Sequence, residues 1–455
     1  MSKYMKCFKI GLLMAIFLMF IVKPTGAAPY ESYIYDFWGR PMPAPQAYMP
    51  YRLVDLDEMG IGSLNNPQDV FVTDDNRIYV LDTGNNRIIC FDKHWNILNV
   101  IDNFSIEGRN ETFDRPMGFF VTADGSIYVA DRNNARIIEL DREGGFVRMI
   151  ASPRANVEGV VREDLQFFPV DVVVDQAGRI YVLAEGIYEG IIEFDVGGNF
   201  RGFIGAPRVR PAIADIIWKR IATREQRLRL ALFLPTEYTG IDLDYKGFIF
   251  TTEASMVKRL NPAGLDVLRR TGFTEPVGDV AVYYEFEDEP EWERASHFVD
   301  IVARDLGMYS VIDQRRGRVF TYDEEGNLLY VFGGLGSVRG LFRMPVALEM
   351  IGDNMVILDS KLNQLTIFKP TVYAQNIHSA IRYHQMGRFE NATRKWEQVL
   401  EQNVNFDLAY SGIGRALLEQ GLYDEAMRNF RLGHNRREYS EAFTMYRRDF
   451  IRGNF

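Results

Sequence analysis

The chain of 455 residues is poor in the side chains that hold metals or cross-link a small fold. Its only two cysteines are Cys7 and Cys90, and its five histidines are spread along the sequence. A disulfide framework and a cysteine-based zinc site are therefore excluded. A zinc centre of three histidines is excluded from the repeats described below, because they contain only His94 and His297.

Positive charge is scarcer than negative charge. Lysine and arginine total 52 against 62 for aspartate and glutamate, which gives a net charge of -10. Binding to a nucleic acid by phosphate neutralisation has no support from this balance, so we expect no nucleic-acid partner. The hydrophobic fraction of 47% is typical of a globular protein with a large core.

Long apolar runs are also missing, apart from residues 10–22. Lys3, Lys6 and Lys9 precede this run, and small residues follow it at positions 25–27. The run is shorter than the roughly 20 residues that a membrane-spanning helix needs. The pattern predicts a signal peptide over residues 1–27 and an exported protein of the cell envelope or the extracellular space. An uncleaved signal acting as an anchor stays open as the alternative.

What the sequence does contain is a pattern that recurs about every fifty residues. Pro67 and Asp82 of the first unit return with the same spacing as Pro116 and Asp131, and Ile-Tyr-Val precedes the aspartate each time. Four later units begin near residues 169, 240, 276 and 345. Short β-branched and aromatic runs separated by Asp, Asn and Gly predict four antiparallel strands in each unit.

Six such sheets arranged radially form a β-propeller. The last unit lacks a fourth strand after Phe368, and we expect residues 51–56 to supply it and close the ring. The units resemble the NHL repeat, whose hallmarks are the Ile-Tyr-Val-Ala-Asp run and the Asn-x-Arg-Ile that follows it. The resemblance covers roughly residues 51–369 and implies a six-bladed propeller, but it does not define an activity.

Residues 371–455 show helical spacing instead. Gly387, Ala392 and Trp396 recur at a constant spacing as Gly421, Ala426 and Phe430. This tail resembles tetratricopeptide repeats followed by a capping helix. The expected organisation is a mainly β chain with a signal peptide (1–27), a lead-in (28–50), the propeller (51–370) and a small helical domain (371–455). The propeller carries insertions at about 206–234 and 284–298. The whole resembles exported NHL-repeat proteins of Gram-positive bacteria.

The first candidate site is a ring of carboxylates at the propeller channel. Asp69, Asp171 and Asp279 are the candidates for metal ligands, and Ca²⁺ is the cofactor that such oxygen donors fit. The structural alternative is that short side chains there satisfy backbone amides. The aligned positions of the six units are Asp69, Gly118, Asp171, Gly240, Asp279 and Ala347.

The second candidate site is the groove of the helical tail. In the tetratricopeptide family, ligands lie against the first helix of each repeat, and residues packing on the propeller are the alternative. The matching positions are Ile377, Ile381, His384, Gln385, Ser411, Arg415, Leu418 and Glu419.

Two charged segments interrupt the propeller. Residues 212–232 predict a basic amphipathic helix, which can bind an anionic membrane surface or an acidic partner, or can cover the edge of its own propeller. Residues 285–293 are acidic and can pair with it or remain a solvated loop.

These features favour an exported interaction scaffold or accessory binding protein of a cell-envelope or transport assembly, with a protein partner and with peripheral membrane contact left open. The alternative is a metal-dependent propeller hydrolase or lyase acting on an extracellular small molecule or carbohydrate. The sequence assigns no catalytic residue and favours a protein that is not an enzyme. It does not identify the partner or the oligomeric state.

Overall fold

The computed structural model describes residues 28–54, 56, 59–153, 166–205, 237–279 and 295–454. The expected signal peptide, the basic segment 212–232 and the acidic segment 285–293 lie outside the described residues.

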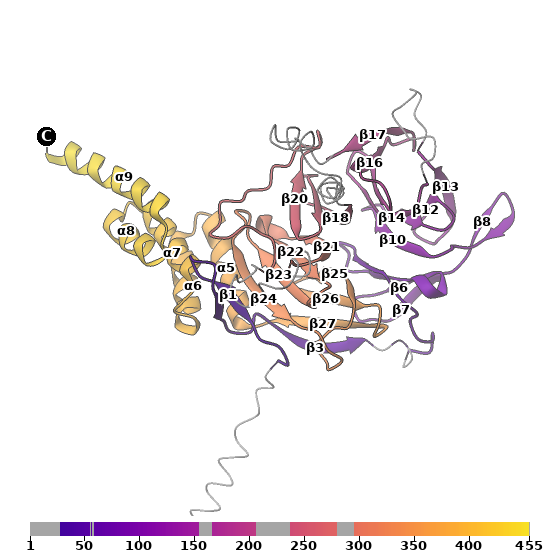
Figure 1. Cartoon of the computed structure of the whole chain (residues 1–455), viewed down its shortest axis with the longest axis horizontal. Coiled ribbons are helices and arrows are strands. Elements are labelled where there is room, and N and C mark those ends of the chain that lie inside the picture. Colours follow the sequence, from indigo (N-terminus) through magenta and orange to yellow (C-terminus); the bar gives the residue numbers. More distant parts are fainter. Residues whose placement is uncertain are drawn as a thin grey trace, which may run out of the picture.

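Six antiparallel sheets stand around a common axis and form a six-bladed β-propeller (Figure 1). Blades 1, 2 and 3 consist of β4 (Asp69–Val72), β5 (Ile78–Asp82), β6 (Arg87–Phe91) and β7 (Ile97–Ile101); β10 (Pro116–Val121), β11 (Ile127–Asp131), β12 (Arg136–Leu140) and β13 (Phe146–Ala151); and β14 (Pro169–Val174), β15 (Ile180–Ala184), β16 (Ile191–Phe194) and β17 (Phe200–Ile204).

The other three blades differ more from one another. Blade 4 has three strands among the described residues, whereas blade 6 borrows its fourth strand from the N-terminal part of the chain. Their strands are β18 (Tyr238–Leu243), β19 (Ile249–Glu253) and β20 (Met256–Leu260); β21 (Phe298–Ala303), β22 (Tyr309–Asp313), β23 (Arg318–Tyr322) and β24 (Leu328–Gly333); and β25 (Pro345–Ile351), β26 (Asn354–Asp359), β27 (Gln364–Pro370) and β3 (Tyr48–Val54).

The ring closes as the sequence predicts, through pairing of β27 with β3. The closing strand covers Tyr48–Val54 rather than residues 51–56, and Leu365 pairs with Val54 at one end of the register. The pairing covers the outer edge of β27, which would otherwise be free to pair with other chains.

Buried aspartates explain the repeated motif of the blades. Asp82 accepts hydrogen bonds from Asn65 N at 2.8 Å, from Asn85 Nδ2 at 2.8 Å and from Arg87 Nε at 2.7 Å. Asp131 makes the same three kinds of bond in blade 2. The Asp and the Arg thus tie the loop that enters a blade to the end of its second strand, which is why the two residues recur together.

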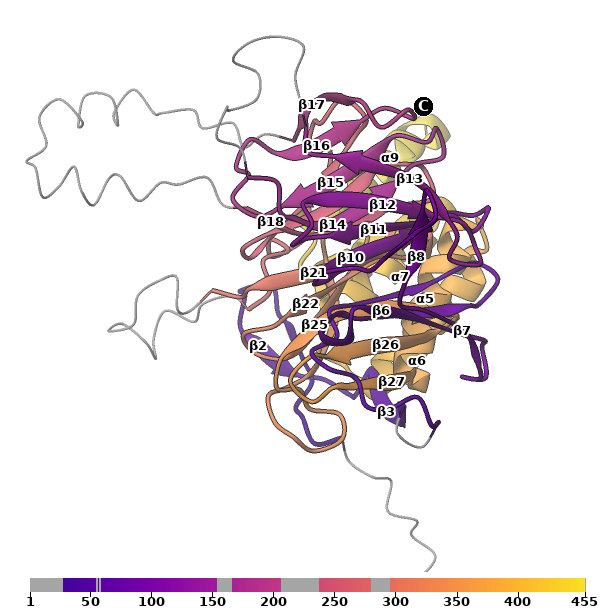
Figure 2. The same ribbon diagram turned by 90° about the vertical axis from the view of Figure 1, so that its right-hand side faces the viewer.

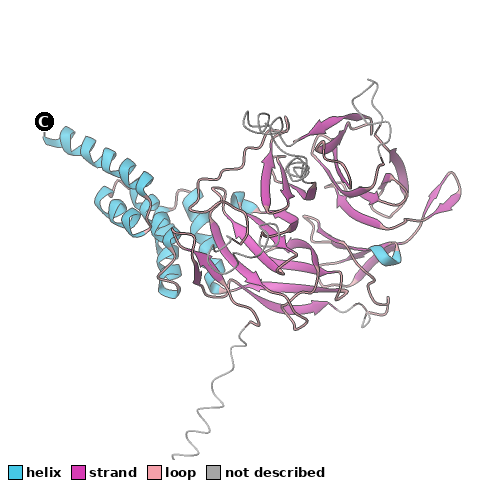
Figure 3. Ribbon diagram, viewed as in Figure 1, coloured by secondary structure: helices cyan, strands magenta, loops and turns pink. Residues whose placement is uncertain are grey.

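The tail contains five helices, which Figure 3 shows in cyan beside the magenta strands. They are α5 (Val372–Gln385), α6 (Phe389–Gln402), α7 (Asp407–Glu419), α8 (Tyr423–Leu432) and α9 (Arg436–Asn454). Each helix packs on the next, and two glycines of α7 allow close contact. A Cβ at Gly412 would lie 2.3 Å from Trp396 Nε1, and one at Gly414 would lie 2.6 Å from Phe430 Cε1.

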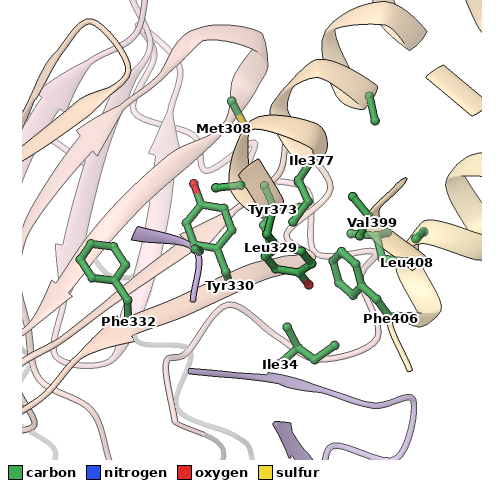
Figure 4. Packing of buried hydrophobic residues seen from close by; sticks show 14 of the residues in the cluster. Ile34, Met308, Leu329, Tyr330, Phe332, Tyr373, Ile377, Val399, Phe406 and Leu408 are labelled. Carbon is green, nitrogen blue, oxygen red and sulfur yellow. The ribbon is translucent and has the colours of Figure 1, made fainter. Parts of the chain in front are cut away.

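The helical tail and the propeller share one hydrophobic core (Figure 4). Tyr373 and Ile377 of α5 lie in the same buried cluster as Leu329 and Tyr330 of β24. The cluster also includes Ile34 from the hairpin of β1 (Tyr33–Tyr35) and β2 (Pro41–Pro43). Figure 2 shows the helices against the propeller from a second direction. A second small hairpin, β8 (Phe104–Ile106) with β9 (Arg109–Glu111), precedes blade 2.

Candidate functional site

Acids alternate with small residues where the innermost strands of the blades meet. Asp69, Asp171 and Asp300 occupy equivalent positions of blades 1, 3 and 5, as their pairing with the second strand of each blade shows. The same position in blades 2, 4 and 6 is taken by Gly118, Gly240 and Ala347. The sequence therefore predicted the ring correctly in five of its blades.

The placement of Asp279 in this ring is wrong. The innermost strand of blade 5 is β21, which begins at Phe298, so Asp300 takes the channel position. The insertion that precedes β21 displaces the start of the unit, which made the proline at position 276 look like the start of a blade.

Asp279 instead fastens the N-terminal hairpin to blade 5. It accepts hydrogen bonds from the hydroxyl groups of Tyr33 and Tyr35, the latter at 3.2 Å. It also forms ion pairs with Arg318 and with Arg316, whose Nε lies 3.2 Å from Asp279 Oδ2. This carboxylate is therefore an anchor between two segments of the chain.

Two of the three ring carboxylates, Asp69 and Asp300, join neighbouring blades. Asp69 Oδ2 accepts a hydrogen bond of 2.9 Å from the amide of Phe119 in blade 2, and Oδ1 accepts one of 2.8 Å from Val70. Asp300 Oδ2 binds the amide of Leu348 in blade 6 at 2.8 Å. These contacts match the structural alternative, in which short acidic side chains satisfy backbone amides.

Steric crowding explains the small residues between the acids. A Cβ at Gly118 would lie 2.6 Å from Val170 O and 2.9 Å from Asp171 Cα of the next blade. A Cβ at Gly240 would lie 2.8 Å from Asp300 Cα. Each glycine thus makes room for the acidic residue of the blade that follows it.

Two further acids in the channel were missed by the sequence analysis. Asp242 Oδ2 accepts a hydrogen bond of 2.7 Å from Ala303 N in blade 5, and Glu349 Oε1 accepts one of 2.7 Å from Met350 N. They follow Gly240 and Ala347 by two residues on the same strands. Side chains two apart on a strand face the same side, so this spacing was the available signal.

Burial raises the pKa values of all five channel acids. The pKa rises to about 7 for Asp69 and for Asp242, chiefly because the protein excludes water from them. The pKa of Asp171 rises well above its usual value through burial and through the charges of Asp69 and Asp300. The pKa values of Asp300 and Glu349 rise for the same reasons. Burial therefore favours the protonated forms of these acids.

The space beside these acids is small. The cavity that they line has a volume of about 30 Å³, which suits roughly one water molecule. In the part of the chain that the structure describes, no three His, Cys, Asp or Glu side chains are arranged to hold a metal ion. The carboxylates point to backbone amides instead, so the described geometry does not fit the expected Ca²⁺ site.

The groove residues of α5 lie against other parts of the protein. Ile377 is fully buried in the shared core, and Ile381 packs on its edge. Gln385 Nε2 donates a hydrogen bond of 2.9 Å to Leu306 O of the propeller. His384 packs on Phe389, and burial lowers the pKa of its imidazole.

The groove residues of α7 are similarly engaged, apart from the exposed Glu419. Arg415 donates to Glu438 of α9 at 2.8 Å and to Glu325 of blade 5 at 2.7 Å. Ser411 is buried, and Leu418 packs on the shared core. Of the two alternatives for this groove, packing on the propeller is the one that these contacts match.

Apolar side chains are exposed on the last helix. Phe443, Phe450 and Ile451 of α9 expose 46%, 55% and 49% of their surfaces. The rings of Phe450 and Tyr446 stack at 6.3 Å. Tyr446, Phe450 and Ile451 follow Phe443 by three, seven and eight residues, which places these side chains on one side of the helix. Figure 1 shows α9 extending away from the propeller.

Within the described residues, no helix has the length and hydropathy needed to span a membrane.

A sequence model of the NHL repeat matches residues 64–91. No curated protein matches the chain. Among solved structures, virginiamycin B lyase from Staphylococcus aureus is similar at 10% identity and a TM-score of 0.43, covering 70% of this chain and 99% of its own. A streptogramin B lyase is similar at 11% identity and a TM-score of 0.44, covering 72% and 100%.

Proposed function

We propose that the chain is an exported interaction scaffold whose helical tail binds a protein partner of the cell envelope or of a transport assembly. The propeller is the rigid base on which the tail is fixed. The observation that carries this proposal is the exposed apolar stripe on α9, formed by Phe443, Phe450 and Ile451.

In stacked helical repeats, each hairpin covers the apolar face of the one before it, so the outer face of a terminal helix is normally polar. An apolar stripe at that position marks an interaction surface. The propeller supports this role because the shared core and Arg415 hold the tail in one orientation. A fixed surface loses less conformational entropy on binding than a mobile one.

The test is co-purification from native cells, with the wild type compared against a variant that carries Phe443→Ser, Phe450→Ser and Ile451→Ser. We expect a defined envelope or transport protein with the wild type and at least a tenfold loss with the variant. The matched control replaces three exposed apolar residues of the propeller, Leu98, Val147 and Val196, by serine. Equal recovery from the α9 variant would refute the proposal.

A second candidate function is a metal-dependent hydrolase or lyase acting on an extracellular small molecule or carbohydrate. The raised pKa values of the channel acids favour it, since a carboxylic acid protonated near neutral pH can act as a general acid. The bonds to backbone amides and the cavity of about 30 Å³ weigh against it. Metal that co-purifies stoichiometrically, and that is lost in Asp171→Ala, would support the enzyme.

A further inference from the structure

A large pocket lies between the N-terminal hairpin and the helical tail. Its volume is about 730 Å³, which is within the range of ligand sites. The turn of the β1–β2 hairpin forms one wall, and the junction of α8 and α9 forms the other. The lining residues used below are Phe37, Trp38, Arg431, His434, Arg436 and Tyr439. None of them belongs to the predicted groove.

Aromatic side chains form one side of this pocket. Phe37 stacks on His434 at 5.5 Å with an angle of 20° between the rings, and Trp38 meets His434 edge-on at 4.9 Å. Trp38 nevertheless exposes 61% of its surface. An exposed tryptophan held by neighbouring rings offers a planar apolar face at low entropic cost.

The backbone at His434 is unusual for the residue that occupies it. His434 has a φ of 54°, in the left-handed region that favours glycine, and glycines with positive φ, Gly387 and Gly421, take the same position two residues after the ends of α5 and α7. Gly433 before it leaves no room to shift, because a Cβ there would lie 2.7 Å from Asp407 O. A histidine in this conformation indicates that its side chain has a role. The ring of His434 packs against Phe37 and Trp38 in the wall of the pocket.

The pocket is also positively charged. Arg431 and Arg436 have no carboxylate partner among the described residues, and Arg431 lies over the ring of Tyr439 at 5.5 Å. Asn435 Oδ1 caps α9 by accepting a hydrogen bond from Glu438 N at 3.2 Å. The first amides of this helix therefore add positive potential at the same wall.

The nearby acids already have partners within the protein. Asp407 Oδ2 accepts a hydrogen bond from Phe37 N at 3.2 Å and lies 3.4 Å from His434 Nδ1. Asp36 pairs with Arg40 at 2.9 Å. Glu438 pairs with Arg415. The positive charges of Arg431 and Arg436 are thus the ones that remain for a ligand.

We propose that this pocket binds an acidic peptide segment with an aromatic side chain, contributed by a partner protein. The aromatic side chain packs between Trp38 and Tyr439, and the flanking carboxylates pair with Arg431 and Arg436. A peptide fits better than a small molecule because Trp38 is largely exposed, so the pocket is open on this side. Sites for small molecules bury most of the ligand surface. This inference rests on the proposed function, since it names the chemistry of a protein partner.

The test uses the full-length protein and a fluorescein-labelled peptide of sequence Glu-Glu-Phe-Glu-Glu, followed by fluorescence anisotropy. We expect saturable binding that weakens at least tenfold with Arg431→Ala plus Arg436→Ala, and at least fivefold with Trp38→Ala. The matched control is Arg447→Ala plus Arg448→Ala, which removes the same charge from α9 away from the pocket and should leave the Kd unchanged. Trp38→Leu, together with the thermal midpoint, shows whether a loss arises from unfolding.

Three results would overturn the inference. They are equal weakening by the control pair, an unchanged Kd with both Trp38 variants, and binding of phenylacetate as tight as that of the peptide. A peptide in which serine replaces phenylalanine should bind at least fivefold more weakly. Failure here is distinguishable from failure of the proposed function, because the α9 stripe variant leaves the pocket residues intact and is scored on recovery of the partner.

Discussion

Asp69, Asp171 and Asp300 show how far single residues could be interpreted from sequence. The type and position of Asp69 and Asp171 follow from the repeat, which also indicates the two alternatives of metal binding and amide capping. Two of the three acids also bind an amide of a neighbouring blade, as Asp69 does with Phe119, fifty residues away. No local pattern specifies such a partner. Blade 5 was misaligned because an insertion interrupts the unit just before β21.

Replacing Asp171 by asparagine should reduce the dependence of stability on pH. The pKa of Asp171 is raised in the folded state, so between the unfolded pKa near 4 and the folded pKa the native state binds more protons, and stability falls as pH rises. One proton corresponds to a slope of at most about 1.4 kcal/mol per pH unit. The side-chain amide of the variant would not titrate. Urea unfolding between pH 5 and pH 8 measures this slope.

The control for this prediction is Asp102→Asn, which removes the same charge from an exposed position. It should leave the slope unchanged. A slope in Asp171→Asn equal to that of the wild type would mean that Asp171 is ionised in the folded protein.

The blades and the helices could be predicted from the sequence better than the contacts between them. The Asp turns that join strands are local: Asp141 Oδ1 binds the amides of Glu143 at 3.0 Å and Gly145 at 2.7 Å. A pattern of a few residues suffices to specify such a turn. The recurring Gly387, Ala392 and Trp396 likewise marked a helical hairpin. The pattern did not show that the ring of Phe430 contacts Gly414.

Gly414→Ala should destabilise the tail. The new Cβ would lie 2.6 Å from Phe430 Cε1, and Phe430 is fully buried, so α7 and α8 must separate. Overpacking of this kind costs about 1–3 kcal/mol. The chemical denaturation midpoint, followed by helical circular dichroism, measures the loss. Glu419→Ala, an exposed change in the same helix, should shift stability by less than about 0.5 kcal/mol.

The propeller, the N-terminal hairpin and the tail form one structural unit. Arg304 of the propeller donates to Tyr330 Oη at 2.9 Å and to Tyr48 Oη at 3.2 Å, and Tyr330 Oη lies 2.7 Å from His378 Nε2 of α5. The sequence indicated two repeat types but not their docking. Groove positions such as Ile377 and Arg415 were identified from the tail alone, whereas their partners belong to blade 5 and to the last helix.

His378 should make the docking of the tail sensitive to acid. Burial lowers the pKa of His378 well below its usual value, so the unfolded state binds more protons below about pH 6.5. Stability of the docked tail is therefore present above that pH and is lost as the pH falls. Hydrogen exchange of α5, corrected for intrinsic rates, should increase between pH 7 and pH 5.5. His378→Gln should remove this change, while His94→Gln, at an exposed turn, should not.

Photo-cross-linking in native cells shows whether the exposed face of α9 contacts a protein partner. A photoreactive amino acid is placed at position 443 on α9, or at position 98 on the outer strand of blade 1 as the control. We predict one dominant cross-linked envelope or transport protein from position 443 that is absent from position 98. The same products from both positions, or no product from position 443, would contradict the account.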